Sequence, residues 1–172
     1  MKLEVLDPFD HMMRVGTVEN ILRFGFLMIN FDHDKKTLCF HVTSPYLYPP
    51  TFSDLNGIPI YDQNNFRFFW KTYQFQNNEM RAPANVFPQK KYVCNFKEGM
   101  IIETFNLRAH GVVSYAIVLR VVGRILLIDF IHHSSSNGLL VDCESPCLYP
   151  VGFYAILHQR EKNIRFDHLP VG

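Results

Sequence analysis

One stretch of this sequence occurs twice, about one hundred residues apart. Residues 99–130 read GMIIETFNLRAHGVVSYAIVLRVVGRILLIDF, and the last thirty of these positions match residues 2–31 without a gap. A chain that repeats at this period holds copies of one small structural unit, so the repeat constrains the fold more than any single motif does. The matched pairs, each 99 residues apart, include Glu4 with Glu103, Leu27 with Leu126 and Phe31 with Phe130.

The repeat continues farther along the chain with a slightly larger offset. Ser44-Pro45 matches Ser145-Pro146 at a distance of 101 residues, so the intervening loop is two residues longer in the second copy. The same offset relates Tyr48-Pro49 to Tyr149-Pro150 and Phe52 to Phe153. Because the lengths of the strands stay fixed while a loop changes, the sequence predicts two tandem copies of one β-module.

The residues inside each copy favour strands. Val112 to Val122 is rich in β-branched and apolar residues, Gly123-Arg124 is a two-residue turn, and Ile125 to Ile131 runs back as the partner strand. We interpret Ser44 to Pro50 as a turn bounded by prolines that contains a single helical turn. In the first copy we expect strands over Met1–Leu6, Met13–Leu22, Phe24–Phe31 and Leu38–Val42.

The pattern changes between the copies. Phe66, Phe69, Trp70 and Tyr73 are spaced i, i+3, i+4 and i+7, which is typical of one face of a helix. We expect this helix to pack its four aromatic rings against an apolar patch of a neighbouring barrel.

Composition excludes several classes of function. The chain is 48% hydrophobic and 15% aromatic, which is enough for folded cores. Its net charge of +1 gives no strong signal for nucleic-acid binding. Its apolar runs fall short of the roughly 20 residues that a membrane helix needs. The four cysteines are expected to be free thiols, because no secretory signal begins the chain.

Two further alternatives come from the histidines and cysteines. His132, His133, Cys143 and Cys147 have a spacing that a zinc site permits, but Cys147 falls inside the repeated Ser-Pro turn. A Cys–His hydrolase is the enzymatic alternative, yet the histidines are scattered and no nucleophile motif accompanies them. We therefore expect no metal, no cofactor and no enzymatic activity.

These segments resemble a known family. GMIIE, YAIVLRVVGRILLIDF and SPCLYPVGF in the second copy, and KLEVLDPFDH and SPYLYPPTF in the first, are similar to the core of a malignant brain tumour (MBT) repeat. FRFFWKTY followed by RAPANVF resembles the N-terminal arm of such a repeat. The resemblance implies a mainly β protein of two tandem small Tudor-like (SH3-like) β-barrels, joined by an arm with one short helix.

The resemblance also gives domain boundaries. Residues 1–60 form a first core, here called core one, which lacks its own arm. Residues 61–158 form the second repeat, with an arm over 61–95 and a core over 96–158, here called core two. Residues 159–172 form a C-terminal tail.

The family's known role sets the functional expectation. MBT repeats are chromatin-associated, nuclear, non-enzymatic readers, and one core usually holds mono- or dimethylated lysine. Aromatic faces attract the methylammonium group, and a carboxylate accepts a hydrogen bond from its remaining N–H, which trimethyl-lysine lacks. The resemblance therefore implies histone tails and proteins of repressor complexes as partners, without a membrane.

Carried over residue by residue, the family's pocket is incomplete in both cores. Core one keeps the carboxylate, Asp7, and one aromatic ring, Phe31. It has Asp34 where the family usually has Trp and Leu38 where the family usually has Tyr. Phe40 is a partial replacement for this Tyr. Core two keeps one aromatic ring and lacks the acid. The candidate residues are Asp7, Asp10, Phe31, Asp34, Leu38 and Phe40 in core one, and Asn106, Phe130 and His133 in core two.

Two functions remain open. The first is a reader-like module in transcriptional repression with degenerate lysine pockets, in which core one still attracts unmethylated or monomethylated lysine. The second is a scaffold that binds subunits of a repressor complex without reading lysine.

Overall fold

The fold was obtained as a computed structural model, which describes residues 1–32, 34–62, 66–77, 80–87, 92–106, 112–131 and 138–157. The chain divides into two compact units, Met1–Tyr92 and Val93–Gly172.

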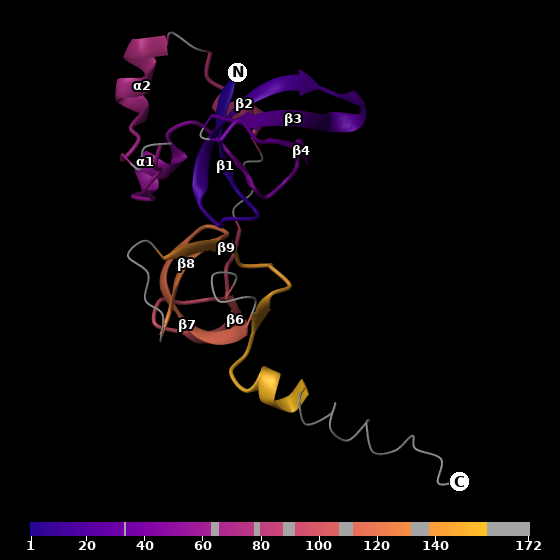
Figure 1. The fold of residues 1–172 in the computed structure, drawn as a ribbon, viewed down its shortest axis with the longest axis vertical. Helices are drawn as coiled ribbons and strands as arrows, with labels where there is room; N and C mark the ends of the chain where they lie inside the picture. Colours follow the sequence, from indigo (N-terminus) through magenta and orange to yellow (C-terminus); the bar gives the residue numbers. More distant parts are fainter. Residues whose placement is uncertain are drawn as a thin grey trace, which may run out of the picture. The chain divides into compact units, whose positions relative to one another are not determined.

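The first unit is a curled antiparallel sheet of five strands in the order β4-β3-β2-β1-β5 (Figure 1). A 3₁₀ turn, η1, separates β2 from β3, and a short helix, α1, follows β5. The elements are β1 (Lys2–Leu6), β2 (Met13–Ile21), η1 (Arg23–Gly25), β3 (Phe26–Phe31), β4 (Thr37–His41), β5 (Leu47–Tyr48) and α1 (Phe52–Asn56).

The second unit repeats this sheet in the order β10-β6-β7-β8-β9. Each strand has its counterpart in the first unit at the same place, which confirms the two tandem β-modules and the mainly β fold that the sequence predicts. The predicted turn at Gly123 is also confirmed, since its φ is 58°. The strands are β6 (Ile101–Asn106), β7 (Val112–Val122), β8 (Ile125–Phe130), β9 (Leu139–Asp142) and β10 (Leu148–Tyr149).

The segment after the Ser-Pro turn differs from the prediction. The single helical turn that we expected within Ser44 to Pro50 is wrong, because Leu47 and Tyr48 form strand β5 and pair with β1. The helical segment, α1, begins only at Phe52. In the second unit, residues 153–157 are helical at the matching place.

A buried glutamate fixes this helix in both units. Glu4 on β1 accepts hydrogen bonds from the backbone N–H of Ser53, at 2.8 Å, and from its hydroxyl. Glu103 on β6 accepts hydrogen bonds from the backbone N–H groups of Gly152 and Tyr154. Each carboxylate thus satisfies N–H groups at the start of a helix, which otherwise have no partner within the helix.

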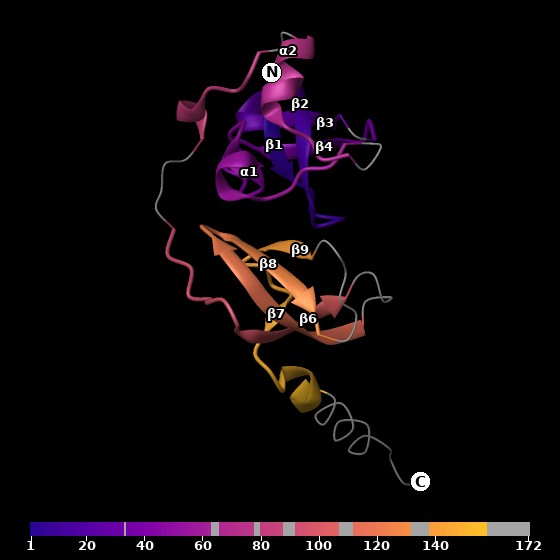
Figure 2. The ribbon, with the colours of Figure 1, turned by 90° about the vertical axis from the view of Figure 1, so that its left-hand side faces the viewer.

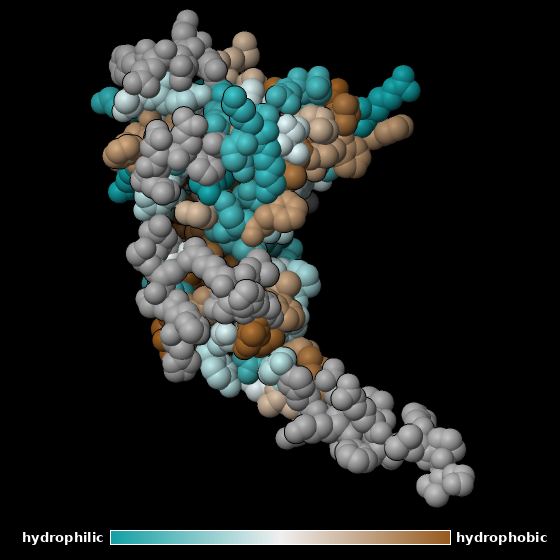
Figure 3. All heavy atoms as spheres, in the orientation of Figure 1, coloured by the Kyte–Doolittle hydropathy of each residue, from teal (hydrophilic) through white to brown (hydrophobic). Residues whose placement is uncertain are grey.

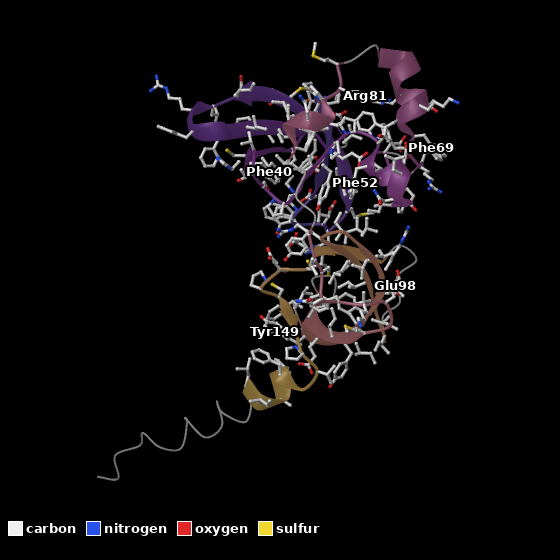
Figure 4. The ribbon with its side chains drawn as sticks, turned by 180° about the vertical axis from the view of Figure 1, so that it is seen from behind. Phe40, Phe52, Phe69, Arg81, Glu98 and Tyr149 are labelled. Carbon is white, nitrogen blue, oxygen red and sulfur yellow. The ribbon has the colours of Figure 1, made fainter. Side chains whose placement is uncertain are left out.

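A stacked aromatic pair accompanies each glutamate. Tyr48 stacks on Phe52 with ring centroids 4.5 Å apart, and Tyr149 stacks on Phe153 at 4.7 Å. Phe52 and Tyr149 are labelled in Figure 4. The repeat therefore extends from the sequence to individual side-chain contacts.

The expected helix between the modules begins later than its periodicity predicts. Helix α2 (Trp70–Asn77) excludes Phe66 and Phe69, which are 71% and 47% exposed. Before the helix, Arg67 forms an antiparallel bridge with Tyr61, and the N–H of Phe68 donates a hydrogen bond to the carbonyl oxygen of Ile60. These residues therefore pair with an earlier part of the chain instead of starting the helix. The aromatic cluster of the arm consists of Phe68, Trp70 and Tyr73.

The arm packs on the sheet of the first unit (Figure 2). The indole N–H of Trp70 donates a hydrogen bond to Glu4, and the hydroxyl of Tyr73 donates one to Asp32. The backbone of Lys2 bonds with Met80 and Ala82, so this part of the arm lies parallel to β1. A second 3₁₀ turn, η2 (Ala84–Val86), follows.

The tip of the β2–β3 hairpin presents apolar side chains to solvent. Phe24 is 88% exposed and has a left-handed backbone, with φ at 61°. Hydrophobic spheres mark this tip in Figure 3. The exposed apolar residues of the tip are Ile21, Leu22, Phe24 and Phe26.

Candidate lysine-binding site

The loop between β1 and β2 positions one carboxylate. Asp7 follows β1 directly, and its side chain accepts a hydrogen bond of 2.8 Å from the backbone N–H of Phe9. Its backbone bonds with Met12 and His11, and His11 closes the loop with φ at 57°. Asp7 is only 2% exposed, whereas the ring of Phe9 is 64% exposed. The loop thus holds a buried acid beside an exposed aromatic ring.

The loop between β3 and β4 positions one cation. The backbone N–H of Phe31 donates a hydrogen bond to the carbonyl oxygen of Lys36, at 2.8 Å. The backbone N–H of Lys36 donates one to the carboxylate of Asp34, at 3.0 Å. Because both backbone groups of Lys36 are held, its side chain starts from a fixed point next to Phe31.

The two loops meet at the side chain of Lys36. The Nζ atom of Lys36 lies 3.2 Å from Oδ2 of Asp7 and 3.5 Å from Oδ1. The same atom lies 4.1 Å from the ring centroid of Phe9 and 5.8 Å from that of Phe31. A carboxylate and two aromatic faces therefore surround one ammonium group, which is the chemistry that binds a lysine side chain. We call Asp7, Phe9 and Phe31 the core-one site.

The structure brings only some of the predicted core-one residues to this point. Asp7 bonds to the ammonium group of Lys36. Phe31 is 1% exposed and packs in the core of the first unit, with its ring centroid 5.8 Å from that group. Asp34 is exposed and holds the backbone of the loop. The others have structural contacts: Asp10 binds the guanidinium of Arg14, and Leu38 and Phe40 pack in the core of the first unit, where Figure 4 labels Phe40.

Two residues were missed in the sequence: Phe9, which belongs to the core-one site, and Lys36, whose ammonium group occupies it. Phe9 lies in the Asp7-Pro8-Phe9-Asp10 turn, and Lys36 lies in a run of charged residues. A large apolar residue inside a polar turn is the signal that could have identified Phe9. No such signal marks Lys36 in the sequence, because the residue that it contacts, Asp7, lies 29 positions earlier in the chain.

Core two is described in part. Phe130 is 3% exposed and packs in the core of the second unit. Asn106 is the last residue of β6, and its backbone pairs with Val112. His133 lies outside the described residues. In the sequence, Asn106 and Arg108 stand where core one has Asp7 and Phe9, so core two has neither the acid nor the second ring at these positions.

The residues that the structure describes contain no group of three or more His, Cys, Asp or Glu side chains that could hold a metal ion. The four cysteines are free thiols. Within the described ranges, no helix has the length and apolar character that would carry it across a bilayer.

Two tandem curled antiparallel sheets of five strands each define a class of small β-barrel modules. A family model described as "mbt repeat" matches residues 1–67 and 100–158. The chain belongs to the MBT-repeat family.

Relatives and a solved structure agree with this assignment. "MBT domain-containing protein 1" of Homo sapiens is 33% identical over 162 residues, covering 89% of this chain and 26% of that protein. "Polycomb protein Sfmbt" of Drosophila melanogaster is 31% identical over 179 residues, covering 98% of this chain and 15% of that protein. This chain thus spans only 26% and 15% of the length of these two relatives.

The solved structure contains a bound peptide. It is the crystal structure of the four MBT repeats of Drosophila melanogaster Sfmbt in complex with the peptide RHR (me)K VLR. It matches with a TM-score of 0.80 and 31% identity over 92% of this chain and 39% of that chain. The fold and family expected from the sequence are confirmed.

Proposed function

We propose that this chain is a nuclear, chromatin-associated binding module in transcriptional repression, and that core one binds the ammonium group of a lysine side chain in its unmodified or lower methylation states. The proposal involves binding without catalysis and without a cofactor. Histone tails are the proposed ligands, and proteins of a repressor complex are the proposed partners. The methylated peptide in the Sfmbt structure supports this choice of ligand.

One observation carries the proposal: the ammonium group of Lys36 bonds to the carboxylate of Asp7 and lies over the ring of Phe9. Asp7 is buried, and a buried carboxylate needs a cation to offset the loss of water. Mono- and dimethyl-lysine keep an N–H that can bond to this carboxylate, whereas trimethyl-lysine has none. With only two rings, the cation–π attraction is about 0.5–2 kcal/mol per ring, so we expect weak binding.

Core two lacks the carboxylate on which the proposal for core one depends. Asn106 replaces the acid, so an ammonium group there lacks a carboxylate partner. We propose that core two is degenerate as a lysine pocket.

A peptide titration tests the reader function. Histone-tail peptides with unmodified, mono-, di- and trimethyl-lysine are titrated into the wild type and into the Asp7→Asn and Asp10→Asn variants. Asp10→Asn is the matched control, because the carboxylate of Asp10 binds Arg14 and not Lys36. We expect the lower methylation states to bind, Asp7→Asn to lose this binding and Asp10→Asn to keep it. Folded protein that binds no peptide up to millimolar concentration contradicts the proposal.

A second candidate function is a scaffold that binds repressor-complex proteins without reading lysine. The exposed apolar tip of the β2–β3 hairpin favours it, because clustered apolar side chains on a surface are typical of protein contacts. The test tethers the chain to a reporter gene through a DNA-binding domain. Repression that survives Asp7→Asn and falls when Leu22→Ser and Phe24→Asn are combined supports the scaffold. Repression that the tip variant leaves unchanged contradicts it.

A further inference from the structure

The core-one site is filled by the chain's own lysine. The ammonium group of Lys36 takes the place that an external lysine ammonium needs, since it bonds to Asp7 and lies over Phe9. Two ammonium groups cannot share this carboxylate at the same distance without like-charge repulsion. Binding of an external lysine at Asp7 therefore requires Lys36 to leave.

We propose that Lys36 is an internal competitive ligand that gates the core-one site. The inference rests on the proposed function of that site and adds what controls it. In the closed state Lys36 neutralises Asp7. In the open state Lys36 extends into solvent, and the lysine of a partner peptide takes over the contacts with Asp7, Phe9 and Phe31.

The backbone around Lys36 makes it an effective competitor. Its carbonyl oxygen accepts the N–H of Phe31, and its own N–H bonds to Asp34, so the tether to the site is one side chain long. A short tether gives an intramolecular ligand an effective concentration of at least about millimolar. A weak external ligand binds only the molecules from whose site Lys36 has left. Its apparent affinity is therefore its affinity for the open state multiplied by the fraction of molecules in that state.

The side chain of Lys36 is also able to leave. It is 34% exposed, whereas that of Asp7 is only 4% exposed, so opening moves Lys36 into water and leaves the acid behind. If Lys36 leaves and no other cation replaces it, the buried carboxylate of Asp7 has no cationic partner, which costs free energy. Exchange for another ammonium group keeps the charge paired, so the site favours replacement of Lys36 over an empty state.

The neighbouring residue, Lys35, provides a matched control for Lys36. Lys35 stands next to Lys36 and is exposed, and its backbone N–H bonds to the carbonyl oxygen of Phe31. Lys35→Gln and Lys36→Gln change the net charge equally and place the same side chain in the same loop. Only Lys36→Gln removes the ammonium group from Asp7.

The experiment titrates Nα-acetyl-lysine methylamide with zero, one, two or three Nζ-methyl groups, followed by the amide NMR signal of Phe9. The gate predicts that Lys36→Gln binds the monomethyl probe about tenfold more tightly than the wild type. Lys35→Gln should bind like the wild type. Adding Asp7→Asn to Lys36→Gln should abolish the binding.

The outcomes separate the gate from the function. Equal, Asp7-dependent binding by the wild type and Lys36→Gln overturns the gate and leaves the reader function standing. No binding by any folded variant overturns both. A nuclear Overhauser effect between the Lys36 side chain and the ring of Phe9 in the free wild type is an independent readout. Its absence in well-resolved spectra overturns the closed state.

Discussion

The indole Nε1–H of Trp70 donates a hydrogen bond of 2.6 Å to Oε1 of Glu4, and neither residue is more than 1% exposed. The other carboxylate oxygen of Glu4 bonds to Ser53 at the start of α1. One buried side chain thus joins the sheet of the first unit to both α1 and the arm. The guanidinium of Arg81 lies 5.3 Å from the Trp70 ring and adds to this contact (Arg81 is labelled in Figure 4).

The first prediction concerns this hydrogen bond. Trp70→Phe keeps an aromatic ring and removes the donor, so an oxygen of Glu4 loses its partner in a buried place. We expect the free energy of unfolding of the first unit to fall by about 1–3 kcal/mol. Amide NMR signals during urea denaturation report each unit separately, and those of the second unit should not change.

The control for Trp70→Phe is Phe66→Leu. Phe66 belongs to the same segment but is 71% exposed, so its substitution should change stability by no more than about 0.5 kcal/mol. Equal losses in the two variants would mean that the arm, and not the hydrogen bond to Glu4, determines the effect.

The second prediction concerns the ion pairs of Arg124 in the second unit. Arg124 binds Asp142 through two nitrogens, each at 2.8 Å, and also binds Glu144 at 2.7 Å. Asp142 is 4% exposed, whereas the side chain of Glu144 is 56% exposed. We expect Arg124→Ala to cost on the order of 2–3 kcal/mol, because it strips a buried carboxylate of its cation.

Glu144→Ala is the matched comparison for Arg124→Ala. It removes the exposed ion pair with Arg124 and leaves Asp142 paired, so it should cost no more than about 1 kcal/mol. Urea denaturation of both variants, followed by circular dichroism, measures the difference. A loss in Glu144→Ala as large as that in Arg124→Ala would show that burial of Asp142 is not the cause.

The third prediction concerns Gly16 on β2. A Cβ atom there would lie 2.6 Å from Cγ2 of Ile29 and 3.0 Å from Cγ2 of Val5, both core residues. We expect Gly16→Ala to overpack the core and to lower the free energy of unfolding by about 1–3 kcal/mol. Cys39→Ala, on an exposed position of β4, is the control and should be nearly neutral. Thermal unfolding that is unchanged in Gly16→Ala would contradict the close packing.

The repeat made the fold predictable from the sequence. Glu4 and Glu103 stand at matching positions 99 residues apart, and each one holds a helix start against its own sheet. The periodicity of the arm was less informative. Its aromatic spacing included Phe66 and Phe69, but Arg67 and Phe68 pair with the backbone of residues 60 and 61 before the helix begins, and Phe68 joins the aromatic cluster.

The contacts around the ammonium group of Lys36 were predictable only for the residues that end strands. Asp7 and Phe31 end strands whose positions the repeat determines, and the structure places both at the ammonium group. Phe9 and Lys36 lie in loops, where the two modules differ in sequence. Their contact depends on the conformations of two separate loops, which periodicity and spacing do not specify.

The last prediction concerns the pH dependence of the first unit. Burial raises the pKa of Glu4 from 4.5 to about 7, although Ser53 and Trp70 donate hydrogen bonds that favour the charged form. In the unfolded chain the carboxyl group has its ordinary pKa. Between these two values the folded state binds more protons than the unfolded state, so the free energy of unfolding must fall as the pH rises.

The stabilisation from this proton is fully present below about pH 4.5 and is lost as the pH rises through about 7. A shift of this size corresponds to about 3 kcal/mol between the two limits.

Urea denaturation of the wild type and of Glu4→Gln, between about pH 5 and about pH 8, measures this loss of stability. The wild type should lose stability relative to Glu4→Gln as the pH rises, because Gln does not titrate. Glu19→Gln, which removes an exposed carboxylate from the same unit, should keep the wild-type slope. A parallel pH profile for the wild type and Glu4→Gln would mean that Glu4 is ionised throughout and that its three hydrogen bonds outweigh its burial.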